Sequence, residues 1–124
     1  MIIDADLMFS KDQAVTATAA STVAVDLGAA GDAIGQELTF HTVVTANFAT
    51  LTSLTPKVQT SANNSDWEDV VIGPTIARAS LLKGTDIFCV RVPQGLKRYV
   101  RLYYTVTGSN ATTGKITAFA SKDL

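Results

Sequence analysis

Apolar and polar residues alternate most regularly between Tyr99 and Val106, in a segment that begins after a Pro-x-Gly turn and ends before Gly108. Strict alternation is the pattern of a β-strand that is buried on one face only. We therefore expect a strand whose core face consists of Val100, Leu102, Tyr104 and Val106. The outward face would carry Tyr99, Arg101, Tyr103 and Thr105.

The same alternation recurs in shorter form along the rest of the chain and predicts an all-β protein. Residues 38–46, 54–60 and 115–121 each alternate, and clusters of Gly, Pro, Asn and Ser separate the predicted strands. Asp4–Phe9 is expected to be a short first strand or arm, followed by a polar break at Ser10, Lys11 and Asp12. We count about eight short strands, spaced roughly 10–15 residues apart, as in a two-sheet antiparallel sandwich or a small barrel. At 124 residues the chain is long enough for a single domain, 1–124, with its own core.

Charge is unevenly distributed along the chain, although the net charge is only −1. Residues 1–56 hold six acids and one base, whereas residues 76–101 hold six bases and one acid. The near-neutral total argues against a general nucleic-acid binder. This separation of acidic from basic residues can orient one copy of the protein against another copy, or against a charged lattice. Solvated strand faces and loop tips would give the same distribution, so both interpretations stay open.

The amino-terminal residues do not have the pattern of a targeting signal. Met1–Asp6 is acidic and lacks both a basic region and a long apolar run, unlike a secretory signal peptide. No stretch approaches the ~18–20 apolar residues that are needed to cross a bilayer. We expect a protein that is made in the cytoplasm and has neither a membrane nor nucleic acid as a partner.

Residues that usually carry catalysis or bind metals are scarce. The only histidine, His41, lies within a predicted strand and is expected to be a satisfied or solvent-facing residue, because no nucleophile or acid is evident beside it. The only cysteine, Cys89, lies between Phe88 and Val90 and is expected to be a small packed hydrophobe. One histidine and one cysteine form a zinc site only if carboxylates join them.

Two other segments offer ligand atoms without the spacing of a known site. Gly28–Glu37 is rich in glycine but lacks the Lys-Ser/Thr and the G-x-G-x-x-G spacing of phosphate-binding loops. Asp66, Glu68 and Asp69 offer oxygen ligands, but their spacing is not that of an EF-hand loop. We therefore predict no catalytic residue, no metal site and no cofactor, and a protein that is not an enzyme.

The outward face of the 99–106 strand is the best candidate for a binding surface. Tyrosine and arginine are enriched where protein interfaces concentrate their binding energy, and Arg98, Tyr99, Arg101 and Tyr103 lie together here. The only tryptophan, Trp67, follows a polar turn elsewhere in the chain. A neighbouring strand or a second layer that covers these side chains is the alternative, and the pattern alone leaves both open.

Several segments share their pattern with one protein family. They are Met1–Ala5 with Leu7 and Phe9, Val25–Ala30 with Asp32 and Gly35, Gln59–Ser61 with Asn63, Asn64 and Trp67, Arg91–Pro93 with Gly95, Arg98–Leu102 with Tyr104–Val106 and Gly108, and Gly114–Ala118. Together they extend over nearly the whole chain. In these segments the protein resembles the capsid cement (decoration) proteins of tailed phages of the Bordetella podophage type.

The resemblance implies a jelly-roll-like antiparallel β-sandwich with an extended N-terminal segment that binds the outside of an assembled capsid. Such a protein would clamp neighbouring major capsid subunits on the virion exterior, as a homodimer or homotrimer. Residues 1–12 are then a candidate docking arm, because carboxylates alternate with apolar residues there. The predicted interface residues are Ile2, Asp4, Asp6, Leu7, Trp67, Arg98, Tyr99, Arg101 and Tyr103.

Two other functions are compatible with the same sandwich. A carbohydrate-binding module would use Trp67, Tyr99 and Tyr103 as an aromatic platform for a sugar. A tail or baseplate adaptor would be present in few copies per particle. Glycan binding and the copy number per virion distinguish these two functions from capsid cementing.

Overall fold

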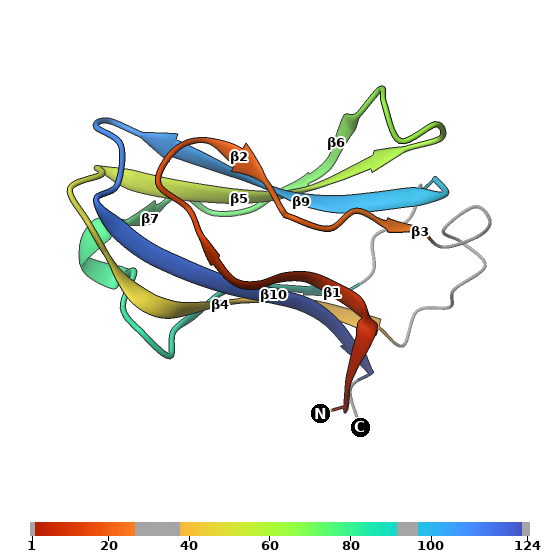
Figure 1. The fold of residues 1–124 in the computed structure, drawn as a ribbon, viewed down its shortest axis with the longest axis horizontal. Coiled ribbons are helices and arrows are strands. Elements are labelled where there is room, and N and C mark those ends of the chain that lie inside the picture. The colour runs from red at the N-terminus through yellow and green to blue at the C-terminus, as the bar shows by residue number, and fades with distance from the viewer. Residues whose placement is uncertain (1, 27–37, 92–96, 123–124) are drawn as a thin grey trace.

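The protein is a sandwich of two antiparallel β-sheets (Figure 1). The computed structural model describes residues 2–26, 38–91 and 97–122, so Gly28–Glu37 and the Pro93–Gly95 turn lie outside the described residues. Within the described ranges the only helical element is a 3-10 turn at Arg78–Ser80. No helix in this part is long and apolar enough to cross a membrane. The predicted all-β antiparallel sandwich is confirmed, and the described ranges alone contain ten strands, against the expected eight or so.

The two sheets differ in size and in strand order. The four-stranded sheet has the order β1-β10-β4-β8. Its strands are β1 (Ile2–Ala14), β10 (Thr113–Lys122), β4 (Leu38–Ala49) and β8 (Asp86–Arg91). The six-stranded sheet has the order β2-β9-β5-β6, with β3 beside β9 and β7 beside β5. Its strands are β2 (Ala19–Ala20), β9 (Tyr99–Thr107), β5 (Ser53–Ser61), β6 (Glu68–Ile72), β3 (Val25–Asp26) and β7 (Ile76–Ala77).

The core between the sheets is filled from the alternating apolar positions of the sequence. In β9, Val100, Leu102 and Tyr104 are buried and Val106 packs against them, as the period-2 pattern predicts. From the other sheet, the core receives Phe40 and Val44 of β4 and Ile116, Ala118 and Ala120 of β10. Each of these strands buries one face because apolar area removed from water stabilises the folded state.

A buried hydroxyl group links the two sheets. Tyr104 in β9 is 0% exposed, and its Oη lies 2.8 Å from Ser10 Oγ in β1. Ser10 Oγ donates its own proton to Gln13 Oε1 at 2.6 Å, so Tyr104 is the donor to Ser10. Burial raises the pKa of the Tyr104 hydroxyl, which keeps it protonated. The bond satisfies a polar group in the core and fixes β9 relative to β1.

Strand β1 continues through a segment that the sequence suggests is a polar break. Its pairing with β10 shifts register between Met8 and Ser10 and again between Ser10 and Gln13. Asp12 adopts a positive φ of 46°, and its N–H donates to Thr117 Oγ1 at 3.0 Å. The predicted break is therefore wrong, because bulges accommodate the polar residues within the strand. Bulges also protect an edge strand from pairing with another chain.

Another bulge decides which side chains of β8 face outward. Successive residues of β4 pair with Phe88 and then with Asp86, so Ile87 is an extra residue in β8. Ile87 and Phe88 are both buried, whereas Asp86 and Cys89 are both exposed. The prediction that Cys89 is a packed hydrophobe is therefore wrong. Because Phe88 points into the core, the next side chain points outward, from a strand at the edge of the sheet.

Candidate functional site

The outward face of the six-stranded sheet carries several of the predicted interface residues. Arg101 and Tyr103 of β9 lie opposite Gln59 and Lys57 of β5, respectively. Trp67 immediately precedes β6, which is the next strand along the sheet. Gln59 is buried and the other four are half-buried. The sheet therefore gathers side chains from three separate segments onto one surface.

Arg101 lies at the centre of this surface. Its guanidinium carbon is 4.3 Å from the centroid of the Trp67 ring and 5.5 Å from that of the Tyr103 ring. Its Nε donates to Gln59 Oε1 at 2.8 Å. Burial lowers the pKa of Arg101, an effect that the charge interaction with Tyr103 only partly offsets, and the arginine remains a cation. Two rings and one hydrogen bond therefore hold the cation in a single position.

Lys57 and Asp69 complete a closed ring of contacts. Lys57 Nζ lies 5.3 Å from the centroid of the Tyr103 ring and 3.2 Å from Asp69 Oδ2. Asp69 Oδ1 accepts a hydrogen bond from Gln59 Nε2 at 2.9 Å. We call the whole set the Arg101 network, and its members are Lys57, Gln59, Trp67, Asp69, Arg101 and Tyr103. Among the described residues no acid forms an ion pair with Arg101, so the network carries an uncompensated positive charge.

Asp69 should make the stability of this sheet depend on pH. The hydrogen bond from Gln59 lowers the pKa of Asp69, burial opposes that shift, and Lys57 lowers the pKa further. A carboxyl group with a lowered folded-state pKa stabilises the fold above its unfolded pKa, and this contribution disappears as the pH falls through the folded value. We expect acidification below about pH 4 to reduce the urea midpoint more in the wild type than in Asp69→Asn. Parallel declines in the two proteins would contradict this assignment.

Arg98 and Tyr99 make a second set of contacts at the start of β9. Arg98 Nε and Nη2 donate to the two carboxylate oxygens of Asp26 in β3, at 2.8 and 3.0 Å. The guanidinium carbon of Arg98 is 5.2 Å from the centroid of the Tyr99 ring. The hydrogen bonds and the charge of Asp26 raise the pKa of Arg98. This pair joins the acidic first half of the chain to the basic second half, so part of the charge split is neutralised within the protein.

The remaining predicted interface residues belong to the four-stranded sheet. Ile2, Asp4, Asp6 and Leu7 are part of β1, whose first residues pair with the end of β10, and their side chains lie outside the described part of the structure. The Arg101 network is on the other layer of the sandwich (Figure 1). A contact through β1 therefore remains a separate prediction from a contact through Arg101.

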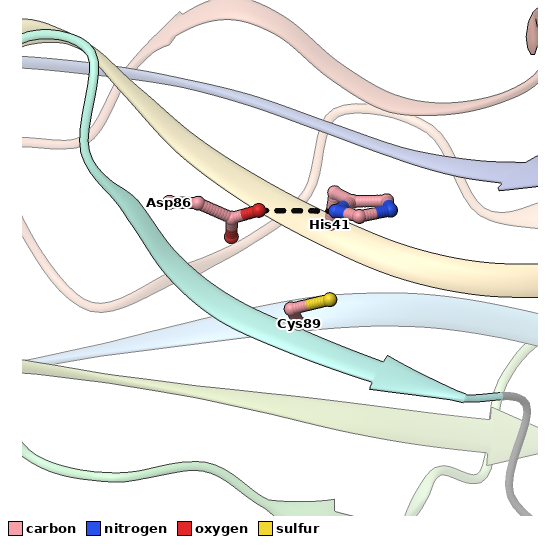
Figure 2. A group of neighbouring side chains, drawn as sticks. All are labelled: His41, Asp86 and Cys89. Carbon is pink, nitrogen blue, oxygen red and sulfur yellow. Dashed lines mark hydrogen bonds and ion pairs between the residues drawn. The ribbon is translucent and has the colours of Figure 1, made fainter. Parts of the chain in front are cut away.

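A different group of polar side chains lies on the four-stranded sheet (Figure 2). His41 of β4 pairs across the strands with Cys89 of β8, and His41 Nδ1 lies 3.0 Å from Asp86 Oδ2. His41 is 5% exposed, and its ring stacks on that of Phe119 at a centroid distance of 5.3 Å. The expectation that His41 has its hydrogen-bonding groups satisfied thus holds for Nδ1, which contacts Asp86. It does not hold for Nε2, which is buried without a hydrogen-bond partner in the described structure.

We call His41, Asp86 and Cys89 the His41 cluster, and the sequence contains one signal for it. Ile87 and Phe88 are consecutive apolar residues, and two neighbouring side chains of one strand enter the same core only where a bulge interrupts the alternation. With a bulge there, Asp86 and Cys89 fall on the same outward face. The cross-strand position of His41 depends on the register between β4 and β8, which the alternation of either strand does not reveal.

One comparison with known protein families matches most of the chain. A family model described as Bbp16 matches residues 9–120. That range includes the Arg101 network and the His41 cluster, but it begins after the predicted interface residues at the start of β1. Among curated proteins no relative matches. The chain therefore belongs to the Bbp16 family of phage structural proteins, whose namesake from a Bordetella phage is of the capsid cement (decoration) type.

Proposed function

We propose that this protein binds the outer surface of an assembled phage capsid and cements neighbouring major capsid subunits. The observation that carries the proposal is the family match over residues 9–120, because that family is one of phage structural proteins. A sandwich with a complete core suits this role, since it folds without help from the capsid and then adds contacts on its surface.

The Arg101 network is the proposed capsid-binding surface. Tryptophan, tyrosine and arginine dominate binding energy at protein interfaces, and here they are already held in place by one another. Side chains that are ordered before binding lose less conformational entropy when the partner arrives. The contacts within the network therefore support the proposal, because they prepare the cation for a partner.

The chemistry of Arg101 points to an acidic partner surface. Its Nε is occupied by Gln59, whereas its two terminal nitrogens have no hydrogen-bond acceptor within the described residues. A guanidinium edge with free N–H groups binds a carboxylate in a fixed geometry. We propose that a carboxylate of the major capsid protein occupies this position.

An exposed apolar side chain lies beside the network. Ile72 of β6 is 66% exposed and is the cross-strand partner of Lys57, so both point to the outward face. An apolar residue next to a fixed cation resembles the centre of a protein interface, where a buried anchor is surrounded by polar contacts. Ile72 would supply apolar area to the capsid contact.

Bridging would multiply the strength of a modest contact. A copy that binds two capsid subunits, or a homodimer or homotrimer that binds several, dissociates only when all contacts break together. Cementing therefore does not require a large interface on each copy. It requires that the binding surfaces of one copy, or of one oligomer, contact adjacent capsid subunits at the same time.

The experiment that tests the proposed function is reconstitution on capsids that were assembled without this protein. Purified protein is added, unbound protein is removed, and the copy number is measured by quantitative mass spectrometry against the major capsid protein. Cementing predicts saturation at a copy number of the same order as the capsid protein, and capsids that break at a higher temperature. A handful of copies per particle would instead identify a tail or baseplate adaptor, and no binding would overturn the proposal.

The same reconstitution tests the proposed docking arm in β1. A deletion must stop at Leu7, because Phe9 is buried in the core and its removal would unfold the sandwich. If residues 2–7 dock onto the capsid, protein lacking them should saturate at a lower occupancy than the full chain. Equal binding curves would exclude the arm and leave the Arg101 network as the proposed contact.

The carbohydrate-binding alternative is disfavoured by the positions of the cations. A sugar platform needs open ring faces, but the Trp67, Tyr99 and Tyr103 rings each have a lysine or arginine within 5.5 Å of the centroid. Displacing those cations would cost the contacts that order the surface. We therefore expect no glycan binding at this face.

A further inference from the structure

The four-stranded sheet brings together the only histidine and the only cysteine of the chain with a carboxylate. The ligand atoms of His41, Asp86 and Cys89 all lie within 4.8 Å of one another. Figure 2 shows the carboxylate of Asp86 directed at the imidazole of His41, with the thiol of Cys89 beside them. These residues meet the condition for a zinc site that His41 and Cys89 alone do not meet, because a carboxylate joins them.

We propose that this cluster binds zinc through His41, Asp86 and Cys89. Imidazole nitrogen, thiolate sulfur and carboxylate oxygen are the three kinds of ligand that zinc uses in proteins. The thiolate selects zinc over magnesium and calcium, which bind oxygen ligands. Three protein ligands leave a fourth tetrahedral position for water on the solvent side, where Asp86 and Cys89 are exposed.

The backbone of the sheet holds the ligands in place. His41 and Cys89 are cross-strand partners in β4 and β8, and the bulge at Ile87 turns Asp86 to the same face. His41 is fixed by its stack on Phe119. Ligand atoms around tetrahedral zinc are separated by about 3.5 Å, given bond lengths of about 2.0–2.3 Å. The present separations therefore require only small side-chain rotations, and the two exposed ligands are those with room to rotate.

Binding rearranges two protons. The Cys89 thiol loses its proton to solvent, because the thiolate is the ligand. Zinc at Nδ1 of His41 takes the place of the proton that the Asp86 contact favours there, so the neutral ring carries its proton on Nε2. Nε2 has no hydrogen-bond partner in the described residues, so the ring lacks the hydrogen bond that usually orients a zinc-bound histidine. The site should therefore be weaker than a closed structural zinc site of four ligands.

Titration of the full-length reduced protein with Co²⁺ tests the site directly. Cobalt adopts the geometry of zinc, and a thiolate ligand adds a sulfur-to-cobalt charge-transfer band in the near ultraviolet. Since the chain has one cysteine, this band can come only from Cys89. We expect the band together with the intense visible bands of tetrahedral cobalt, and we expect equimolar zinc to remove both.

Substitutions at the exposed ligands keep the test independent of folding. Cys89→Ser should abolish the charge-transfer band, and Asp86→Asn should weaken cobalt binding at least ten-fold. Glu68→Gln, which removes an exposed carboxylate elsewhere, should leave the titration unchanged. Wild-type protein that gives only the pale spectrum of hydrated cobalt would overturn the proposal. Visible bands that survive unchanged in Cys89→Ser would also overturn it, because they would locate the metal at other carboxylates.

Discussion

Tyr104→Ala should lower the free energy of unfolding by about 3–5 kcal/mol, the range for removing a large aromatic ring from a packed core. Tyr104 is 0% exposed in the middle of β9. Its ring fills the space between the sheets, and its hydroxyl donates to Ser10 on the opposite layer. Alanine would leave a cavity and remove the hydrogen bond that links the sheets. Urea denaturation followed by circular dichroism measures the change.

Two companion variants separate the contributions of the ring and the hydroxyl. Tyr104→Phe keeps the ring and should cost only about 1 kcal/mol, because Ser10 retains its bond to Gln13. Thr107→Ala, at the exposed end of the same strand, should change stability by less than about 0.5 kcal/mol. A loss in Tyr104→Ala no larger than in Tyr104→Phe would show that the core does not depend on this ring.

Arg101→Ala should weaken attachment to capsids by roughly 30-fold or more, equivalent to about 2 kcal/mol for each contact at an interface hot spot. The variant removes the cation between Trp67 and Tyr103 together with the N–H groups proposed to bind a capsid carboxylate. Multivalent binding would amplify the loss when several contacts on one particle weaken together. Binding isotherms on capsids assembled without the protein provide the measurement.

Arg98→Ala is the matched control for Arg101→Ala. Both changes remove one arginine from β9 or its start, but the Arg98 guanidinium is already paired at two positions with Asp26. We therefore expect Arg98→Ala to bind capsids within about three-fold of the wild type, the usual scale for a paired surface charge. Arg101→Lys should bind nearly as poorly as Arg101→Ala, since lysine lacks the planar fork. Equal affinities for Arg101→Ala and Arg98→Ala would contradict the proposed binding surface.

The N-terminal segment shows how local pattern and tertiary pairing diverge. Ser10, Lys11 and Asp12 form a polar run that ends a strand by local propensity, yet β1 continues to Ala14. Pairing with β10 supplies hydrogen bonds along the segment, and register shifts absorb the residues that do not fit. Ser10 is buried although it is polar, because the Tyr104 hydroxyl is a hydrogen-bond partner for the Ser10 hydroxyl. Tertiary contacts therefore override a local break signal here.

The sequence by itself determined the fold class, the core face of β9 and the family. Alternation in β9 identifies Val100, Leu102 and Tyr104 as core because burial on one face of a strand requires period-2 apolar residues, whatever the neighbouring strand is. The segments shared with the family are also local in sequence. Both signals can be read without knowing which strands pair.

Only the tertiary structure decided which polar side chains meet. The Arg101 network depends on the register that places Gln59 opposite Arg101 and on the return of the chain through Trp67. The His41 cluster depends on pairing between β4 and β8 and on a bulge that reverses the alternation of a single strand. A shift of one residue in either register would turn these side chains to the other face. Register is set by the packing of the whole sandwich, so no single segment of the sequence contains it.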